Sequence, residues 1–353
     1  MCSTFLSVDS RSFYIVDHLE PMTQIIVMSF VNMVSAIVNA VMFYVTLRSS
    51  KNESTTYRIV SFAHNFSLFL AQLYWGLIMN PIPLLPLPGI QSIGILRGII
   101  STFMILMTWI FLFSVSIIMM YVIMLIRLRT LAKKNNIFDI GQKRYYTMLL
   151  VMLLYVILPI FCSWIPGYSS EEKTKIYVAK YYPNCNKALD LPGIFVNTSP
   201  AAILAVTIVS FGLLTTGGIF YITLCCIIIY EIRQQTSTWS SRKRKYHIKV
   251  LHDTVVQNAV KCVFLAVAPA VELWNIFLDP GTDTILLTMV ANVIFVAAPI
   301  PCTLLMFFQN RSYRKFFVET FGCYFCVSGA SSMQDNSKKS GVAVFTIQQK
   351  NWL

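Results

Sequence analysis

Charged residues are scarce in this 353-residue chain. They make up 12% of it, whereas a soluble domain has about 25%. Hydrophobic residues make up 56% instead. A soluble fold has too little interior to bury that much apolar surface, but a lipid bilayer can accommodate it. The composition therefore excludes an ordinary soluble domain and indicates a membrane protein.

The residues and motifs that enzymes use are also missing. The four histidines are scattered, and no two of them have the helical spacing of a metal-binding pair. The sequence has neither a glycine-rich phosphate loop nor a nucleophile elbow. We therefore expect no enzyme activity, no cofactor and no bound metal.

Seven long apolar stretches are present, each near the roughly 20 residues that a helix needs to cross a bilayer. The predicted spans are 22–47, 57–80, 98–126, 146–166, 201–230, 249–275 and 284–308. They predict an all-α membrane fold, a bundle of seven transmembrane helices over 22–308. We expect residues 1–21 to be an extracellular segment and 323–353 a disordered cytosolic tail. No internal repeat is visible, which counts against a transporter built from inverted repeats.

The net charge of +13 could suggest a nucleic-acid partner, but its distribution does not. Most Lys and Arg residues fall in alternate loops and in the carboxyl-terminal tail. This asymmetry predicts an extracellular amino terminus and a cytosolic carboxyl terminus. The cytosolic cations could meet acidic lipid headgroups or surround a cleft where a signalling protein docks. Those next to the third and sixth spans are Arg127, Arg129, Arg242, Lys243, Arg244 and Lys245.

Ionisable residues inside a span are costly and point to function. Asp253, Gln257 and Lys261 recur at four-residue steps in span six, so they share one helix face. Glu272 returns nearly to that face three turns further on. We expect the stripe to point into the bundle, as a switch contact between helices or as a structural polar pair. Pro269 removes a backbone hydrogen bond and favours a kink there.

Aromatic and polar residues gather near the extracellular ends of spans two, three and six. Small-molecule pockets use such aromatic walls with a few polar groups. Trp and Tyr also form belts at the membrane interface, which is the alternative interpretation. The candidate ligand-pocket residues are Tyr74, Trp75, Asn80, Arg97, Glu272, Trp274 and Asn275.

The long external loop 167–200 contains two candidate modification sites. Cys185 lies in an oxidising compartment, where Cys162 or Cys2 is a candidate disulfide partner. Asn197 begins the sequence Asn-Thr-Ser, a glycosylation motif weakened by the proline that follows.

Residues 309–322, after span seven, combine cations with Phe317 and Phe321 at helical spacing. This pattern predicts a short amphipathic helix on the inner leaflet. Cys323 and Cys326 follow it, where palmitoylation would add an anchor; unmodified cysteines are the equal alternative.

Several segments resemble the nematode serpentine chemoreceptors, class I first and class H next. The most specific is 69–96, which joins span two to the proline-rich external loop and ends in Gly-Ile-Leu. Sparser matches extend over the bundle. They are Ser35, Asn39 and Tyr44, then Tyr57-Arg58, His247 ten residues before Gln257, and Tyr313-Arg314-Lys315-Phe316.

The chain also departs from the family pattern. Gln72 stands where an acid is usual, Ala297 and Pro301 replace polar residues, and Ser312 replaces a proline. The Asp-Arg-Tyr and Asn-Pro-x-x-Tyr motifs of class A receptors are missing from spans three and seven.

The resemblance implies a G-protein-coupled chemosensory receptor in the plasma membrane, in sensory cilia of neurons. It would bind a small molecule from outside and activate a heterotrimeric G protein, with membrane lipids as further partners. Two alternatives remain. A ligand-gated channel of the insect type has the opposite orientation, and an ion-coupled transporter would use the Asp253, Lys261 and Glu272 stripe as an ion path.

Overall fold

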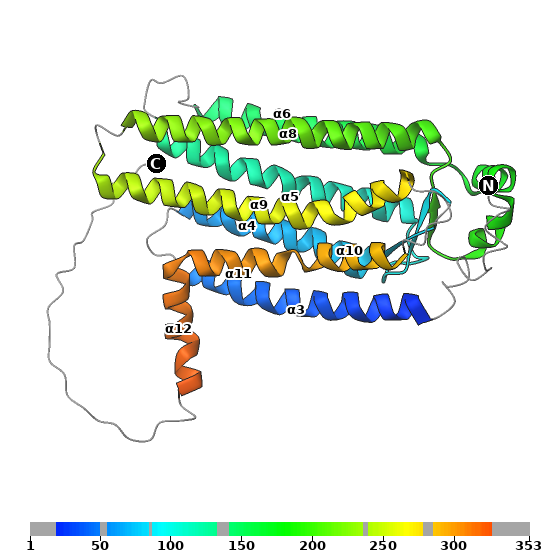
Figure 1. Ribbon diagram of the computed structural model, residues 1–353, viewed down its shortest axis with the longest axis horizontal. Helices are drawn as coiled ribbons and strands as arrows, with labels where there is room; N and C mark the ends of the chain where they lie inside the picture. Colours follow the sequence, from blue (N-terminus) through cyan, green and yellow to red (C-terminus); the bar gives the residue numbers. More distant parts are fainter. Residues whose placement is uncertain are drawn as a thin grey trace.

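The computed structural model describes residues 19–49, 55–84, 87–132, 141–235, 239–277 and 285–326. Long helices lie side by side along one axis and alternate in direction along the chain (Figure 1). They are α3 (Leu19–Ser49), α4 (Thr55–Leu73), α5 (Thr102–Leu131), α6 (Gln142–Trp164), α8 (Pro200–Gln234), α9 (Ser241–Phe277), α10 (Ile285–Ala297) and α11 (Pro299–Gln309). Because α10 and α11 form one broken rod, the predicted all-α bundle of seven spans is confirmed.

The second helix of the bundle, α4, is less apolar than the other membrane spans. Six helical stretches are long and apolar enough to cross a membrane by length and composition, among the described residues, and α4 is not one of them. Its sequence contains His64, Asn65 and Gln72, all of which are buried. These three polar side chains of α4 therefore face the interior of the bundle, whereas its apolar residues Ile59 and Phe66 are exposed.

Two proline effects shape the rods. Span seven is interrupted at Ala298, between α10 and α11, where Pro299 follows and lacks a backbone N–H. Pro269 lies inside α9, which continues as a helix through it to Phe277.

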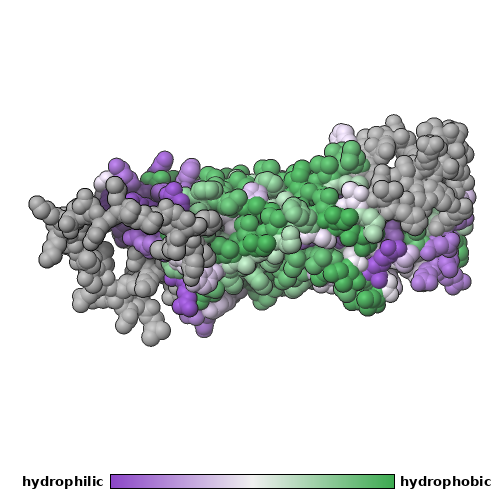
Figure 2. Space-filling model, turned by 90° about the horizontal axis from the view of Figure 1, so that it is seen from below, coloured by the Kyte–Doolittle hydropathy of each residue, from purple (hydrophilic) through white to green (hydrophobic). Residues whose placement is uncertain are grey.

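The surface of the bundle has an apolar belt between two polar ends (Figure 2). Helices α6 and α8 contribute large exposed side chains to it, including Leu150, Leu154, Leu204 and Leu214. Water would penalise such a surface, whereas lipid tails solvate it. The belt is the expected surface of a membrane-spanning protein.

The core has two main parts. One cluster packs residues of α3, α4, α5 and α10, with Trp75, Trp109 and Phe295 at its centre. The other packs α5 against α6, α8 and α9, and includes Leu125 and Ile228. The first lies toward one end of the rods and the second toward the other.

One end of the bundle carries a small antiparallel sheet, and we call it the sheet end (Figure 1). Its strands are β1 (Pro81–Pro83), β2 (Gly89–Ser92) and β3 (Ile194–Val196), with Ile82 opposite Gln91 and Ile90 opposite Phe195. Helix α7 (Glu171–Tyr181) and the 3-10 segment η3 (Pro183–Asp190) pack beside it through Val178, Cys185 and Val196.

The opposite end, where α5 and α8 finish and α9 begins, is the basic end. There α12 (Arg311–Cys326) follows Asn310 and leaves the bundle at a steep angle to the rods (Figure 1). Tyr313 is 2% exposed and packs with Met42, Val45 and Met306, so this contact fixes the start of α12 against α3 and α11.

Candidate functional site

A buried lysine joins two helices in the middle of the bundle. Lys261 of α9 is 1% exposed. Its Nζ donates to Asn65 Oδ1 of α4 at 3.0 Å and also bonds His64 Nε2. A buried polar group without partners costs free energy, so these contacts favour a fixed position of α9 against α4.

The lysine belongs to a wider polar network. Asn65 Nδ2 donates to the backbone oxygen of Ser61 and to Met306 Sδ of α11, at 2.8 and 3.3 Å. Nearby, Thr303 Oγ1 of α11 donates to Asn39 Oδ1 of α3 at 2.8 Å. Four rods are therefore tied together by side-chain hydrogen bonds, away from lipid.

The residues of the predicted stripe on span six make two kinds of contact, between helices and within α9. Gln257 Nε2 donates to Gln309 Oε1 of α11 at 2.7 Å, so both Gln257 and Lys261 make contacts between helices. Asp253 pairs instead with His252 of its own helix at 3.5 Å. Asp253 is partly buried, one turn nearer the basic end than Gln257, and its contact with His252 lies within α9 and not between helices.

Aromatic rings fill the half of the bundle nearer the sheet end. Trp75 and Trp109 have ring centroids 4.1 Å apart, and Phe295 lies 5.5 Å from Trp75. Trp75 Nε1 donates to Asn292 Oδ1 of α10 at 3.1 Å. Tyr74 is half-buried against the same cluster. The structure thus gathers α4, α5 and α10 around one indole.

The backbone around Trp75 is irregular. Helix α4 continues as a π-helix, η1 (Tyr74–Met79), which ends at Asn80 in the left-handed region, with φ of 41°. Asparagine tolerates this conformation better than most residues, and Pro81 prevents further helix. Gln24 Nε2 of α3 donates to Asn80 Oδ1 at 2.8 Å. Short π-helices occur often at functional sites.

The other predicted pocket residues are not gathered there. Trp274 is 61% exposed, and Arg97 is exposed in the turn after β2. This exposure contradicts a pocket role and fits the interfacial alternative for Trp274. The side chains of Glu272 and Asn275 lie outside the described residues.

At the basic end, the predicted partner-contact residues are spread over several elements. Arg129 lies over the ring of Tyr145 at 5.5 Å, and Lys243 over Trp239 at 4.6 Å. Arg127 and Arg244 are partly exposed, whereas Arg242 and Lys245 are exposed.

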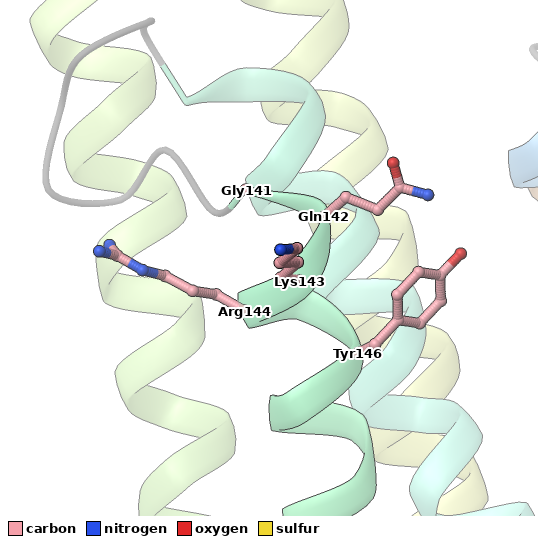
Figure 3. Close-up of a pocket in the computed structure, with 5 residues that line it drawn as sticks. All are labelled: Gly141, Gln142, Lys143, Arg144 and Tyr146. Carbon is pink, nitrogen blue, oxygen red and sulfur yellow. The ribbon is translucent and has the colours of Figure 1, made fainter.

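An open hollow lies at the start of α6 (Figure 3). It is lined by Gly141, Gln142, Lys143, Arg144 and Tyr146. All five residues are exposed, and the labelled side chains point in different directions. The hollow is therefore a basic surface feature and not an enclosed ligand pocket.

Two modification predictions are corrected. Asn197 is 5% exposed, its Oδ1 accepts from the backbone N–H of Ser199 at 3.0 Å, and its amide lies against Gly167. A glycan on that amide would have no room. Cys162 is a free, exposed thiol on α6, whereas Cys185 is buried below the sheet, so the two are not paired.

Two further predictions, on disulfide pairing and on palmitoylation, concern side chains that the structure does not describe. Cys2, the alternative disulfide partner of Cys185, lies outside the described residues. The side chains of Cys323 and Cys326 also lie outside them.

The sequence analysis missed several partners of the site. His64 and Asn65 hold Lys261, and Trp109 and Asn292 contact Trp75. A signal was available in span two, because polar residues at spacings of seven and eight, such as His64, Asn65 and Gln72, mark an inward face.

The apolar belt and the long apolar helices define a multi-pass membrane protein. The profile described as serpentine type 7TM GPCR chemoreceptor Srh matches residues 20–323. The chain belongs to this family. The resemblance to the serpentine chemoreceptors is thereby confirmed, whereas the ranking of class I before class H is not. The family is one of receptors and not of enzymes.

Comparisons with individual proteins add little to the family match. The crystal structure of squid rhodopsin is similar at 13% identity, over 89% of this chain and 90% of that one, with a TM-score of 0.46. No curated protein matches the chain.

Proposed function

We propose that this receptor detects a small molecule from the extracellular side and activates a heterotrimeric G protein in the cytosol. The observation that carries the proposal is the contact of Lys261 with His64 and Asn65. It links α9 to α4 inside the bundle, between an aromatic cluster at one end and a basic surface at the other. A conformational change in the half of the bundle nearer the sheet end can therefore reach the half nearer the basic end through α9.

The arrangement described above is the resting state in this proposal. Lys261 holds α9 to α4, and the Gln257–Gln309 bond holds it to α11. Pro269, toward the sheet end from both contacts, weakens the helix ladder and supplies a pivot. A ligand can favour the open state only by binding it more tightly than the resting state.

The sheet end faces outside and the basic end faces the cytosol in this proposal. Arg127, Arg129 and the run 242–245 surround the site where the G protein docks, and some of them also contact acidic lipid headgroups. Helix α12 lies on the inner leaflet. We place the receptor in the plasma membrane of sensory cilia, a proposal that its membership of a chemoreceptor family supports.

The test is nucleotide exchange on a reconstituted G protein with the variant Lys261→Ala. The variant leaves His64 and Asn65 buried without Lys261 as a hydrogen-bond partner, which raises the free energy of the resting state by about 1–3 kcal/mol. We expect basal exchange to rise about 5- to 150-fold. Lys180→Ala, the same change on exposed helix α7, is the control. Unchanged exchange at normal surface expression would refute the switch role.

A further inference from the structure

The open hollow at the start of α6 is lined by two cations. Lys143 and Arg144 stand beside Gly141, Gln142 and Tyr146 (Figure 3). Helices α5 and α6 contain no acidic residue. In the part of the chain that the structure describes, neither Lys143 nor Arg144 forms an ion pair. The hollow therefore offers two positive charges to an anionic partner.

The hollow lies at the edge of the apolar belt. Tyr146 is 57% exposed, and Leu150 and Leu154 continue the exposed apolar surface along α6. An α-helix rises about 1.5 Å per residue, so Lys143 and Arg144 lie only about 3–5 Å beyond Tyr146 along the axis. The headgroup layer on each side of the hydrocarbon core is about 5–7 Å thick. The two cations are therefore at the level of lipid phosphates.

The hollow is open to the surrounding lipid. Helix α6 packs mainly against α5 and α8. Helices α6 and α8 lie at one edge of the bundle, whereas α11 and α3 lie at the other (Figure 1). A lipid in the surrounding leaflet can therefore reach the hollow from the side, without entering the bundle.

A third cation lies on the neighbouring helix. Arg129 of α5 is over the ring of Tyr145, 5.5 Å from its centroid. Tyr145 is buried and stands between Arg144 and Tyr146 in the chain, so this contact joins the end of α5 to the segment that lines the hollow. Arginine binds phosphate oxygens through two parallel N–H bonds. The basic surface thus extends over the ends of two helices and suits more than one phosphate group.

Size and chemistry select the occupant. The hollow has a volume of about 720 Å³, within the range of about 300–1,000 Å³ that small-molecule sites have. A bare phosphate ion would leave most of this space empty, whereas a sugar-sized ring with several phosphates would fill it. Gln142 and Tyr146 add an amide and a hydroxyl that can bond the hydroxyls of such a ring.

We propose that the hollow binds the headgroup of an inner-leaflet phosphoinositide, an inositol phospholipid with further phosphates on its ring. The phosphates meet Lys143, Arg144 and Arg129, and the acyl chains lie along the exposed apolar face of α6. Basic pockets at the cytosolic ends of membrane helices bind such headgroups. The placement in the inner leaflet rests on the orientation given under the proposed function, whereas the site itself requires neither ligand detection nor G-protein activation.

Binding is tested on the purified full-length receptor in detergent micelles, without G protein. Native mass spectrometry counts the bound molecules during titration with a short-chain phosphatidylinositol bisphosphate, the matching phosphatidylinositol, or free inositol trisphosphate. We expect the bisphosphate lipid to bind most tightly, because only it has both ring phosphates and acyl chains. Equal binding of phosphatidylinositol would exclude recognition of the ring phosphates. Equal binding of free inositol trisphosphate would exclude the membrane as the source, and either result overturns the proposal.

Two double variants locate the binding. Lys143→Gln with Arg144→Gln should lower the affinity for the bisphosphate lipid about 30-fold, since each cation near the membrane surface contributes about fivefold. Arg242→Gln with Lys245→Gln is the matched control, because it removes the same charge from α9 at the same end of the bundle. All four side chains are exposed, so both variants should fold. The control should keep most of the affinity, and an equal loss in both would show diffuse attraction and contradict a site at α6.

The outcome also separates the lipid site from receptor signalling. Selective binding of the bisphosphate lipid by a receptor that produces no nucleotide exchange would keep the site and contradict G-protein activation. A receptor that activates the G protein but does not prefer the bisphosphate lipid would keep the proposed function and overturn the site.

Discussion

The bond between Gln257 and Gln309 gives a quantitative test of how α9 is held. The two amides meet at 2.7 Å, partly buried, and join α9 to α11 near the basic end. A hydrogen bond of this kind contributes about 0.5–1.5 kcal/mol net. If it exists only in the resting state, Gln257→Met should raise basal nucleotide exchange about 2- to 13-fold.

A double-mutant cycle separates this tether from general damage. Gln309→Met should have a similar effect, and the double variant should show little more than either single variant, because one bond is lost in all three. Gln234→Met is the matched control, since Gln234 is exposed and bonds Tyr230 within its own helix. Fully additive effects of the two substitutions, or unchanged exchange in both, would refute the reasoning.

Three further predictions concern the two ends of the molecule. Neutralising Arg242, Lys243, Arg244 and Lys245 with Gln should reduce G-protein activation at unchanged surface expression; full activation would exclude these residues from the docking site. An epitope tag before residue 1 should bind antibody on intact cells, whereas labelling only after permeabilisation, with surface delivery shown separately, would reverse the proposed orientation. Replacing Cys323 and Cys326 with Ser should abolish labelling by a palmitate analogue, and persistent labelling would place the acyl chain elsewhere.

The helices could be predicted from the sequence because bilayer thickness imposes one length on every span. Span five was predicted as 201–230, and α8 runs from Pro200 to Gln234. The break of span seven at Ala298 likewise stands directly before Pro299, which lacks a backbone N–H. Both features depend on local composition and proline chemistry, which a single sequence states directly.

Pairing between helices could not be predicted in this way. Lys261 was assigned an inward position, but its partner His64 lies 197 residues away, and only the rotation of α4 and α9 decides that they meet. The same holds for Trp75 and Asn292, 217 residues apart. Composition likewise misplaced Trp274, because an aromatic near a span end suits a pocket and a membrane interface equally well.

The burial of Asn197 shows a further limit of motif reasoning. Its sequence fits a glycosylation signal, and the segment 167–200 was expected to be a polar external loop. The structure orders that segment into α7, η3 and β3, which leaves the Asn197 side chain packed on Gly167. A motif predicts modification only where the side chain remains accessible.

The most direct test of the central claim is a distance measurement between the basic ends of α9 and α5. Spin labels would replace Tyr246 and Thr130, both exposed, in a background without exposed cysteines. Labels at Ile95 and Leu204, both exposed at the sheet end, serve as the control pair. We predict that Lys261→Ala moves the first pair to longer distances and leaves the control pair unchanged. An unaltered distance between residues 246 and 130 would contradict a switch held by Lys261.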